Sequence, residues 1–136
     1  MKRRSSTAFY VESLLLVALI LSVSVILMRT LGNARTMSLR ARELTGAQQA
    51  AQTVGEYFYA ADDETEFLAL LAQEPSLSAV SDGKWAAQAS GEAYTVQTQY
   101  TTEPQTVGSM AALTVFVTAD DGTELCRYEM NRYLPQ

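Results

Sequence analysis

The sequence predicts an α+β fold, in which one long N-terminal helix packs on a small antiparallel sheet of three to four strands. Three features predict it. Residues 9–28 form a 20-residue apolar stretch with a single charge. An apolar stripe at helical spacing follows, and the C-terminal third alternates like β-strands around an Asp-Gly pair. The 136 residues leave room for one small domain beside the helix.

Charge is divided unevenly along the chain. Residues 1–42 hold seven bases and one acid, a net charge of +6, whereas residues 43–136 hold 14 acids and three bases, a net charge of −11. A domain with this excess of acids repels the phosphate backbone, so we expect no contact with nucleic acid. The chain has no histidine and one cysteine, Cys126. These counts exclude His-dependent catalysis, His-ligated metal sites and an intrachain disulfide, so we expect no cofactor and no metal.

The stretch from Phe9 to Met28 has the length and composition of a membrane-spanning helix, with the lipid bilayer as its partner. Bases lie on both sides, so the positive-inside rule gives a near tie for orientation. The bases after the stretch are interpreted as headgroup anchors; they are Arg29, Arg35, Arg40 and Arg42. A cleaved secretory signal ending at Gly32-Asn33-Ala34 is the alternative. The long apolar run and Arg29 argue against it.

The helix is expected to continue beyond the membrane segment. Seven residues step by three or four positions and share one helical face: Met37, Ala41, Leu44, Ala47, Ala51, Val54 and Phe58. They predict a single helix from about Ala8 to about Tyr59, roughly 75–80 Å long at 1.5 Å per residue. Gly32 could bend it. This stripe is the one available cover for the apolar face of the sheet.

A short second helix is predicted after residue 62. Asp63 and Glu66 resemble a capping box, and Pro75 ends the helix after about Gln73. Residues 76–91 are interpreted as a loop with one short strand around Trp85. Within it, Ser81 to Lys84 matches the S-x-x-K spacing of serine acyl-enzymes. The intervening Asp-Gly pair favours a turn instead of that chemistry.

The C-terminal third is predicted to form strands. Residues 93–102 alternate, and residues 112–130 form a hairpin with a two-residue loop at Asp121-Gly122. That loop pairs Leu113 with Met130, Val115 with Tyr128 and Val117 with Cys126 on one apolar face. It pairs Thr114 with Glu129, Phe116 with Arg127 and Thr118 with Leu125 on the other. Cys126 is therefore interpreted as a core residue, and Asp120 and Asp121 as turn residues, not calcium ligands.

Glu12 lies inside the apolar stretch, where a carboxylate is costly. One interpretation places it at headgroup level, solvated and without a role. The other pairs it with a positive group on a neighbouring chain, which would fix the stagger between two helices. Farther along the stretch, Ala18 and Ser22 are small residues four positions apart. They either allow another helix to approach closely or are merely tolerated.

A basic segment followed by Thr7, Ala8-Phe9-Tyr10-Val11-Glu12 and a long apolar helix resembles the type IV pilins and pseudopilins. That family has a motif such as FTLIE after a glycine, where a prepilin peptidase cuts. The resemblance covers roughly residues 1–30 and aligns Glu12 with the family glutamate. It makes Thr7 and Ala8 the processing site, with Ala8 as the first mature residue. Thr7 replaces the usual glycine and Ala8 the usual phenylalanine, which favours a minor subunit.

The resemblance implies a basic leader at 1–7, a transmembrane helix at 8–28, its amphipathic continuation at 29–59 and a globular domain at 60–136. It also implies a cytoplasmic N-terminus and an extracytoplasmic domain. The expected function is a structural, non-enzymatic subunit of a type IV pilus, competence or type II secretion-like filament. Its partners would be other pilin-like subunits, an assembly platform and a prepilin peptidase. A membrane-anchored binding module that does not polymerise is the alternative, and a tethered enzyme is the least supported class.

Overall fold

The computed structural model describes the backbone of residues 2–135 and the side chains of residues 7–135. Met1, Gln136 and the side chains of Lys2, Arg3 and Arg4 in the expected leader lie outside the described part. The chain divides into two compact units, residues 1–40 and residues 41–136. Each unit is described by itself below.

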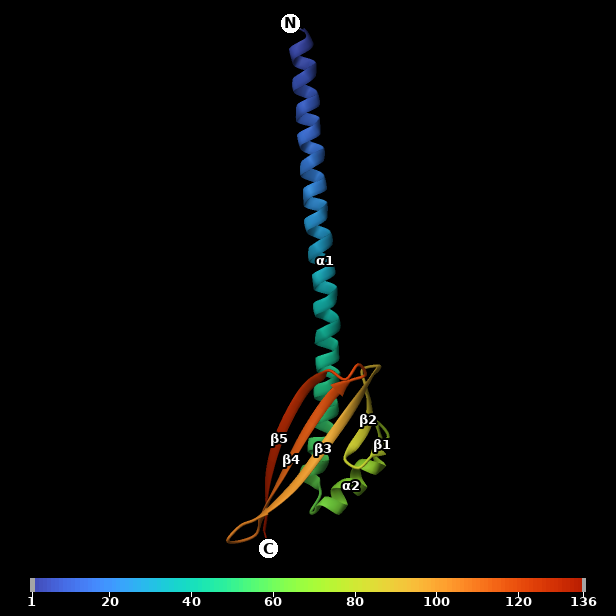
Figure 1. Cartoon of the computed structure of the whole chain (residues 1–136), viewed down its shortest axis with the longest axis vertical. Helices are drawn as coiled ribbons and strands as arrows, with labels where there is room; N and C mark the ends of the chain where they lie inside the picture. The colour runs from blue at the N-terminus through green and yellow to red at the C-terminus, as the bar shows by residue number, and fades with distance from the viewer. Residues whose placement is uncertain (1, 136) are drawn as a thin grey trace. The chain divides into compact units, whose positions relative to one another are not determined.

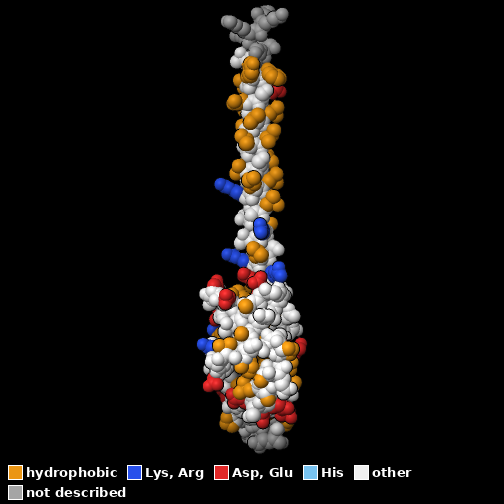
Figure 2. Space-filling model, turned by 90° about the vertical axis from the view of Figure 1, so that its right-hand side faces the viewer, with side chains coloured by type: hydrophobic (Ala, Val, Ile, Leu, Met, Phe, Trp, Pro, Cys, Tyr) orange, Lys and Arg blue, Asp and Glu red, His pale blue; other side chains and the backbone are white. Residues whose placement is uncertain are grey.

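The first element is one uninterrupted helix, α1 (Lys2–Ala60), which continues through Gly32. It starts before the predicted Ala8 and ends one residue after the predicted Tyr59. In the first unit, no described side chain from Thr7 to Arg40 is buried. Figure 2 shows hydrophobic side chains along this part of the helix, up to the first arginine. The helix contains a stretch long and apolar enough to cross a bilayer, none of which is buried within the chain.

The second unit contains the sheet, which α1 covers with its C-terminal part (Figure 1). Five antiparallel strands follow one another in space as they do in sequence: β1 (Leu77–Ser81), β2 (Lys84–Ala89), β3 (Glu92–Pro104), β4 (Ser109–Ala119) and β5 (Glu124–Leu134). The predicted α+β class is confirmed. The predicted three to four strands are too few, because residues 76–91 form a hairpin and not a loop.

The additional hairpin, β1–β2, has a weak sequence signal because it consists mostly of small residues. Leu77, Trp85 and Ala87 supply the buried face, while serine and alanine occupy most other positions. Gly83 closes the turn at φ 69°, in the left-handed region that glycine adopts readily. Ser81 and Lys84 face each other across this turn. The turn interpretation of the S-x-x-K segment is therefore confirmed.

The β4–β5 hairpin has the predicted register but a different loop. Ala119 and Thr123 close a three-residue loop in which Gly122 has φ 84°. A bulge between Val117 and Thr118 then restores the predicted pairing of Val117 with Cys126 and all pairs beyond it. Thr118 consequently pairs with Glu124, not with the predicted Leu125. A type I turn followed by a left-handed glycine suits the strand twist as well as a two-residue loop does.

The core lies between the second half of α1 and one face of the sheet. Four stripe residues are buried there: Ala47, Ala51, Val54 and Phe58. They meet Val96 of β3 and the buried face of β4. The first three stripe residues, Met37, Ala41 and Leu44, are exposed, so their predicted role as sheet cover is wrong. The residues that do pack start at Gly46, where a bare backbone admits the Tyr94 ring.

The edge strand β5 is covered less completely than β4. On the predicted apolar face, Leu113, Val115 and Val117 of β4 are fully buried. Their partners Cys126 and Met130 are half-buried, and Tyr128 is exposed. Cys126 therefore lies on the predicted face without being a fully buried core residue.

The second helix, α2 (Glu64–Gln73), begins and ends as predicted and lies against β1. Asp63 Oδ1 accepts a hydrogen bond from the Glu66 backbone N–H at 2.7 Å. Glu66 Oε2 accepts one from the Asp62 N–H at 2.6 Å, one residue earlier than in a standard capping box. Phe67 and Leu71 anchor the helix in the core.

Candidate functional site

The residues predicted for processing, assembly and helix packing all lie on the exposed surface of the first unit. Thr7, Ala8, Glu12, Ala18 and Ser22 are each exposed within the single chain. A carboxylate and a pair of small residues on an apolar, uncovered helix provide two different means of contacting a neighbour: charge pairing and close approach.

The structure places these two features on different faces. At 100° per residue, Ala18 and Ser22 lie about 100° around the helix from Glu12. A single straight neighbouring helix packs on one face, so it would not contact both Glu12 and the Ala18–Ser22 pair. A contact through Glu12 and a contact through the Ala18–Ser22 pair would therefore involve separate neighbours.

Six hydroxyl groups along α1 are satisfied by the helix itself. Ser22 Oγ donates to the Ala18 carbonyl oxygen at 2.8 Å. The same bond to the residue four positions earlier is made by Ser24, Thr30, Thr36, Thr45 and Thr53. An unsatisfied hydroxyl in hydrocarbon would be costly, and this bond removes the cost. This property was not predicted, although serine and threonine in an apolar helix are its signal.

Arg42 holds part of the folded unit together. Its Nη2 donates to the backbone oxygen of Ser90, in the turn between β2 and β3, at 2.9 Å. Its position after the apolar stretch predicts that Arg42 is a headgroup anchor. Its guanidinium instead has a protein partner 48 residues away. Arg29, Arg35 and Arg40 form no ion pair with any described side chain.

Arg132 of β5 caps the C-terminus of α1. Its Nη1 donates to the carbonyl oxygens of Phe58, at 3.2 Å, and Tyr59, at 2.8 Å. The last turn of α1 has no basic residue of its own, so Arg132 supplies the positive charge that the helix dipole favours there. The predicted hairpin register already puts Arg132 on the apolar face, and a lone arginine on such a face was the available signal.

Tyr57 of α1 and Glu74 after α2 form a short hydrogen bond. Tyr57 Oη donates to Glu74 Oε2 at 2.5 Å. This bond, followed by bonds from Ser76, holds the pKa of the Glu74 carboxyl below its ordinary value. The same bond raises the pKa of the Tyr57 phenol. Each group therefore favours the protonation state that keeps the bond.

We expect Tyr57→Phe to reduce stability at neutral pH and to have less effect in acid. A carboxyl with a lowered folded-state pKa stabilises the fold above its unfolded pKa, and this contribution is lost as the pH falls through the folded value. The difference in unfolding free energy between wild type and Tyr57→Phe should thus shrink below about pH 4.5, the ordinary value for Glu74. Urea titrations of the full chain in detergent micelles, followed by Trp85 fluorescence, measure it. Tyr59→Phe, at an exposed neighbour, is the control. A difference that is constant with pH would contradict the assignment.

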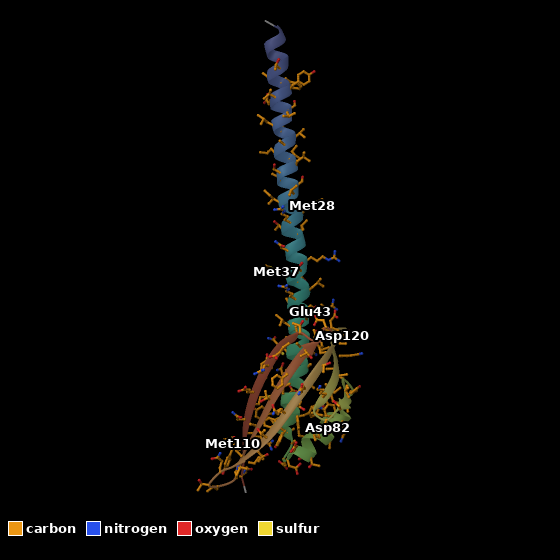
Figure 3. All side chains as sticks on the ribbon, viewed as in Figure 1. Met28, Met37, Glu43, Asp82, Met110 and Asp120 are labelled. Atoms are coloured by element: carbon orange, nitrogen blue, oxygen red, sulfur yellow. The ribbon has the colours of Figure 1, made fainter. Side chains whose placement is uncertain are left out.

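The folded unit has grooves between its secondary-structure elements. The α2–β1 groove has a volume of about 540 Å³, and its lining includes Glu64, Leu68, Val80, Asp82, Trp85 and Tyr100. The α1–β5 groove, of about 480 Å³, is lined by Gln52, Gly55, Tyr59, Tyr128 and Met130, among others. Figure 3 labels Asp82 near α2. Neither groove was predicted, since each combines residues far apart in the sequence.

The indole of Trp85 is the unusual polar group of the α2–β1 groove. Trp85 is 5% exposed, and its Nε1 has no hydrogen-bond acceptor among the described residues. A buried donor without a partner is costly. Acidic and cysteine side chains within the described range do not gather in groups of three that could hold a metal ion.

A long apolar N-terminal helix followed by an antiparallel sheet that its second half covers is a pilin-like architecture. Comparisons with protein-family models, with characterised proteins and with solved structures find no match to this chain. The single long apolar helix near the N-terminus is that of a membrane anchor or a signal sequence.

Proposed function

We propose that the protein is a structural, non-enzymatic subunit of a pilin-like filament, held in the membrane by one N-terminal helix. The observation that carries the proposal is the continuity of α1. One helix presents an uncovered apolar surface from Thr7 to Met28 and, further on, packs on the sheet through Ala47 to Phe58. A cleaved signal sequence has no reason to be continuous in helical structure with the domain's core helix.

The apolar segment has two alternative environments in this proposal. In the membrane it lies in lipid, and the hydroxyl groups of Ser22 and Ser24 are already satisfied along the helix. In a filament it would pack against the equivalent helices of neighbours, after extraction by an assembly motor. The N-terminus would be cytoplasmic and the folded unit extracytoplasmic. The filament could be a type IV pilus, a competence filament or a type II secretion-like filament, and the subunit a minor one.

Glu12 would set the position of each subunit along the filament. Its carboxylate is exposed on an otherwise apolar surface. Surrounded by neighbouring helices, it would be stabilised by a positive group such as the N-terminal region of the next subunit. The cost of leaving a charge without a partner in a low-dielectric setting makes this contact specific.

Glu12→Gln is expected to leave membrane insertion intact and to reduce co-purification with other pilin-like subunits at least about tenfold, equivalent to about 1.4 kcal/mol. Glutamine keeps the shape and the hydrogen-bonding capacity but not the charge. Carbonate extraction measures insertion, and affinity purification from membranes measures assembly. The control is Ser13→Ala, a change at the neighbouring polar residue. Unchanged co-purification of Glu12→Gln would remove Glu12 from the mechanism.

Processing between Thr7 and Ala8 by a prepilin peptidase is a separate part of the proposal. The intact mass of the protein recovered from membranes should correspond to a chain that starts at Ala8. A mass that includes Met1 would mean that the leader remains. A chain that starts near Ala34 and is free in the medium would overturn the membrane-anchored subunit altogether.

The runner-up, an anchored binding module that does not polymerise, shares the same helix and domain. Cysteine cross-linking between copies within residues 9–28 separates the two functions. Copies that carry two cysteines on different faces of this segment should form a ladder of cross-linked oligomers in a filament, whereas the absence of oligomers larger than a dimer at high copy number supports the binding module.

A further inference from the structure

The charged side chains of this chain are arranged for pairing between molecules. The exposed arginines Arg29, Arg35 and Arg40 have no acidic partner among the described side chains. The folded unit carries a large excess of acids. Within the described residues, the ion pair that does form joins Arg127 to Glu124 on β5, at 3.5 Å. Most carboxylates of the unit are therefore available to an outside cation.

The α2–β1 groove is where carboxylates and an apolar hollow coincide. Its charged lining residues are Glu64 and Asp82, both exposed. Leu68 and Val80 are its exposed apolar walls, 39% and 65% exposed, and Tyr100 is half-buried. Strand alternation puts Lys84, next to Trp85, on the opposite face of β2. The groove thus combines acids and apolar surface without a base.

Such a lining fits a cation on a flexible apolar stem. An arginine side chain can lay its methylene groups along apolar surface while its guanidinium forms paired hydrogen bonds with carboxylates. Tyr100, which is half-buried in the same lining, adds an aromatic surface on which a guanidinium can lie.

We propose that the α2–β1 groove binds an arginine side chain from residues 29–40 of a second copy of this chain. The inference deepens the proposed function, on which it rests, by naming a contact between subunits. Charge complementarity selects the occupant. The arginines without a partner among the described residues, Arg29, Arg35 and Arg40, lie in that segment, and 14 of the chain's 15 acids lie in the folded unit. The arginine segment and the groove are different surfaces of the chain. An assembly of any number of copies therefore keeps one empty groove at one end and one unpaired arginine segment at the other. Such a heterologous contact extends without closing.

A charge-reversal exchange tests this contact in full-length protein. Two differently tagged versions are mixed in detergent micelles, and co-purification is measured. Copies carrying Glu64→Lys and Asp82→Lys should co-purify with each other at least about tenfold less than wild-type copies. Mixing them with copies carrying Arg35→Glu and Arg40→Glu should restore the yield, because lysine in the groove then meets glutamate. Glu103→Lys with Glu129→Lys is the control, with the same charge change at exposed acids outside the groove lining.

Each outcome bears on the proposal. Unchanged co-purification of the groove variant, or equal losses in the groove and control variants, would overturn it. A groove variant that loses only a pilin-like partner of different sequence would overturn the assignment to a second copy. If co-purification still depends on Glu12 but is the same with and without the groove substitutions, the groove contact is wrong and the proposed function stands. If no version co-purifies, the proposed function is wrong as well.

A second measurement covers the case in which the groove variant does not fold, as judged by Trp85 fluorescence. In a Cys126→Ala background, one copy carries Asp82→Cys and the other Arg40→Cys. Mild oxidation should join the two copies in a disulfide at least about tenfold faster than it joins the control pair, Glu103→Cys with Arg40→Cys. Equal rates for the two pairs would overturn the proposal.

Discussion

Replacing Phe58 by alanine is expected to lower the free energy of unfolding of the unit Ala41–Gln136 by about 3–5 kcal/mol. Phe58 is 2% exposed and lies at the centre of an aromatic cluster. Its ring meets Phe67 edge-on at 6.2 Å and Tyr100 at 5.9 Å between centroids. Removing it leaves a cavity in a core that has few other large side chains, so the surroundings can fill little of the space.

The neighbouring residue supplies a matched control. Tyr59 follows Phe58 in the same helix but is 56% exposed. Tyr59→Ala should cost no more than about 1 kcal/mol, since it removes little buried area. Urea unfolding of the full chain in micelles measures both, with the single tryptophan, Trp85, as the fluorescence probe. Similar losses for the two variants would contradict the packing described for Phe58.

Gly46→Ala is expected to lower the free energy of unfolding, although alanine is usually preferred to glycine inside a helix. The added methyl group would overlap the Tyr94 hydroxyl oxygen and come within 2.9 Å of its Cζ atom. Tyr94 cannot move away easily, because it is 3% exposed and its hydroxyl donates to the Glu43 carbonyl oxygen at 3.2 Å. The overpacking should cost about 1–3 kcal/mol of stability. Alanine's better helix propensity should return at most ~1 kcal/mol, so the cost is the larger of the two. We expect a net loss of about 1–2 kcal/mol.

Two other glycines of the same helix test the cause. Gly32 has nothing within 4 Å of an added Cβ, so Gly32→Ala should leave the Trp85-reported stability unchanged. At Gly55 the added methyl would meet the Met130 sulfur at 2.9 Å, a flexible thioether that can shift, so Gly55→Ala should cost less than Gly46→Ala. Adding Tyr94→Phe to Gly46→Ala should recover part of the loss. A Gly46→Ala variant as stable as wild type would contradict the close approach.

Local patterns predicted the helices and the hairpin register well, because their signals lie within a few residues. The Asp63 cap, the Pro75 stop and the Leu113–Met130 pairing are examples. The β1–β2 hairpin was missed because it buries small residues around Trp85, and alanine carries little periodic signal. The three-residue loop at Asp120 was missed because its extra residue is cancelled by a bulge, which leaves the rest of the register unchanged.

The candidate sites divide in the same way. Glu12 stands out in the sequence because a charge in an apolar stretch is conspicuous by itself. The α2–β1 groove and the roles of Arg42 and Arg132 depend on residues brought together by the sheet. The predicted stripe on α1 was too long because periodicity shows which residues share a face, and not where the sheet that covers them ends.

The bond between Arg132 and the last carbonyl groups of α1 has a consequence for biosynthesis. Every strand after β1 pairs with its immediate predecessor, so the sheet can grow one strand at a time as the polypeptide reaches its folding compartment, N-terminal part first. The last carbonyl groups of α1 therefore stay without their cap until Arg132, more than 70 residues further along the chain, is in place. A nascent chain cut short before β5 would have most of its sheet but a frayed helix terminus, which would mark it for proteolysis as an unfinished product.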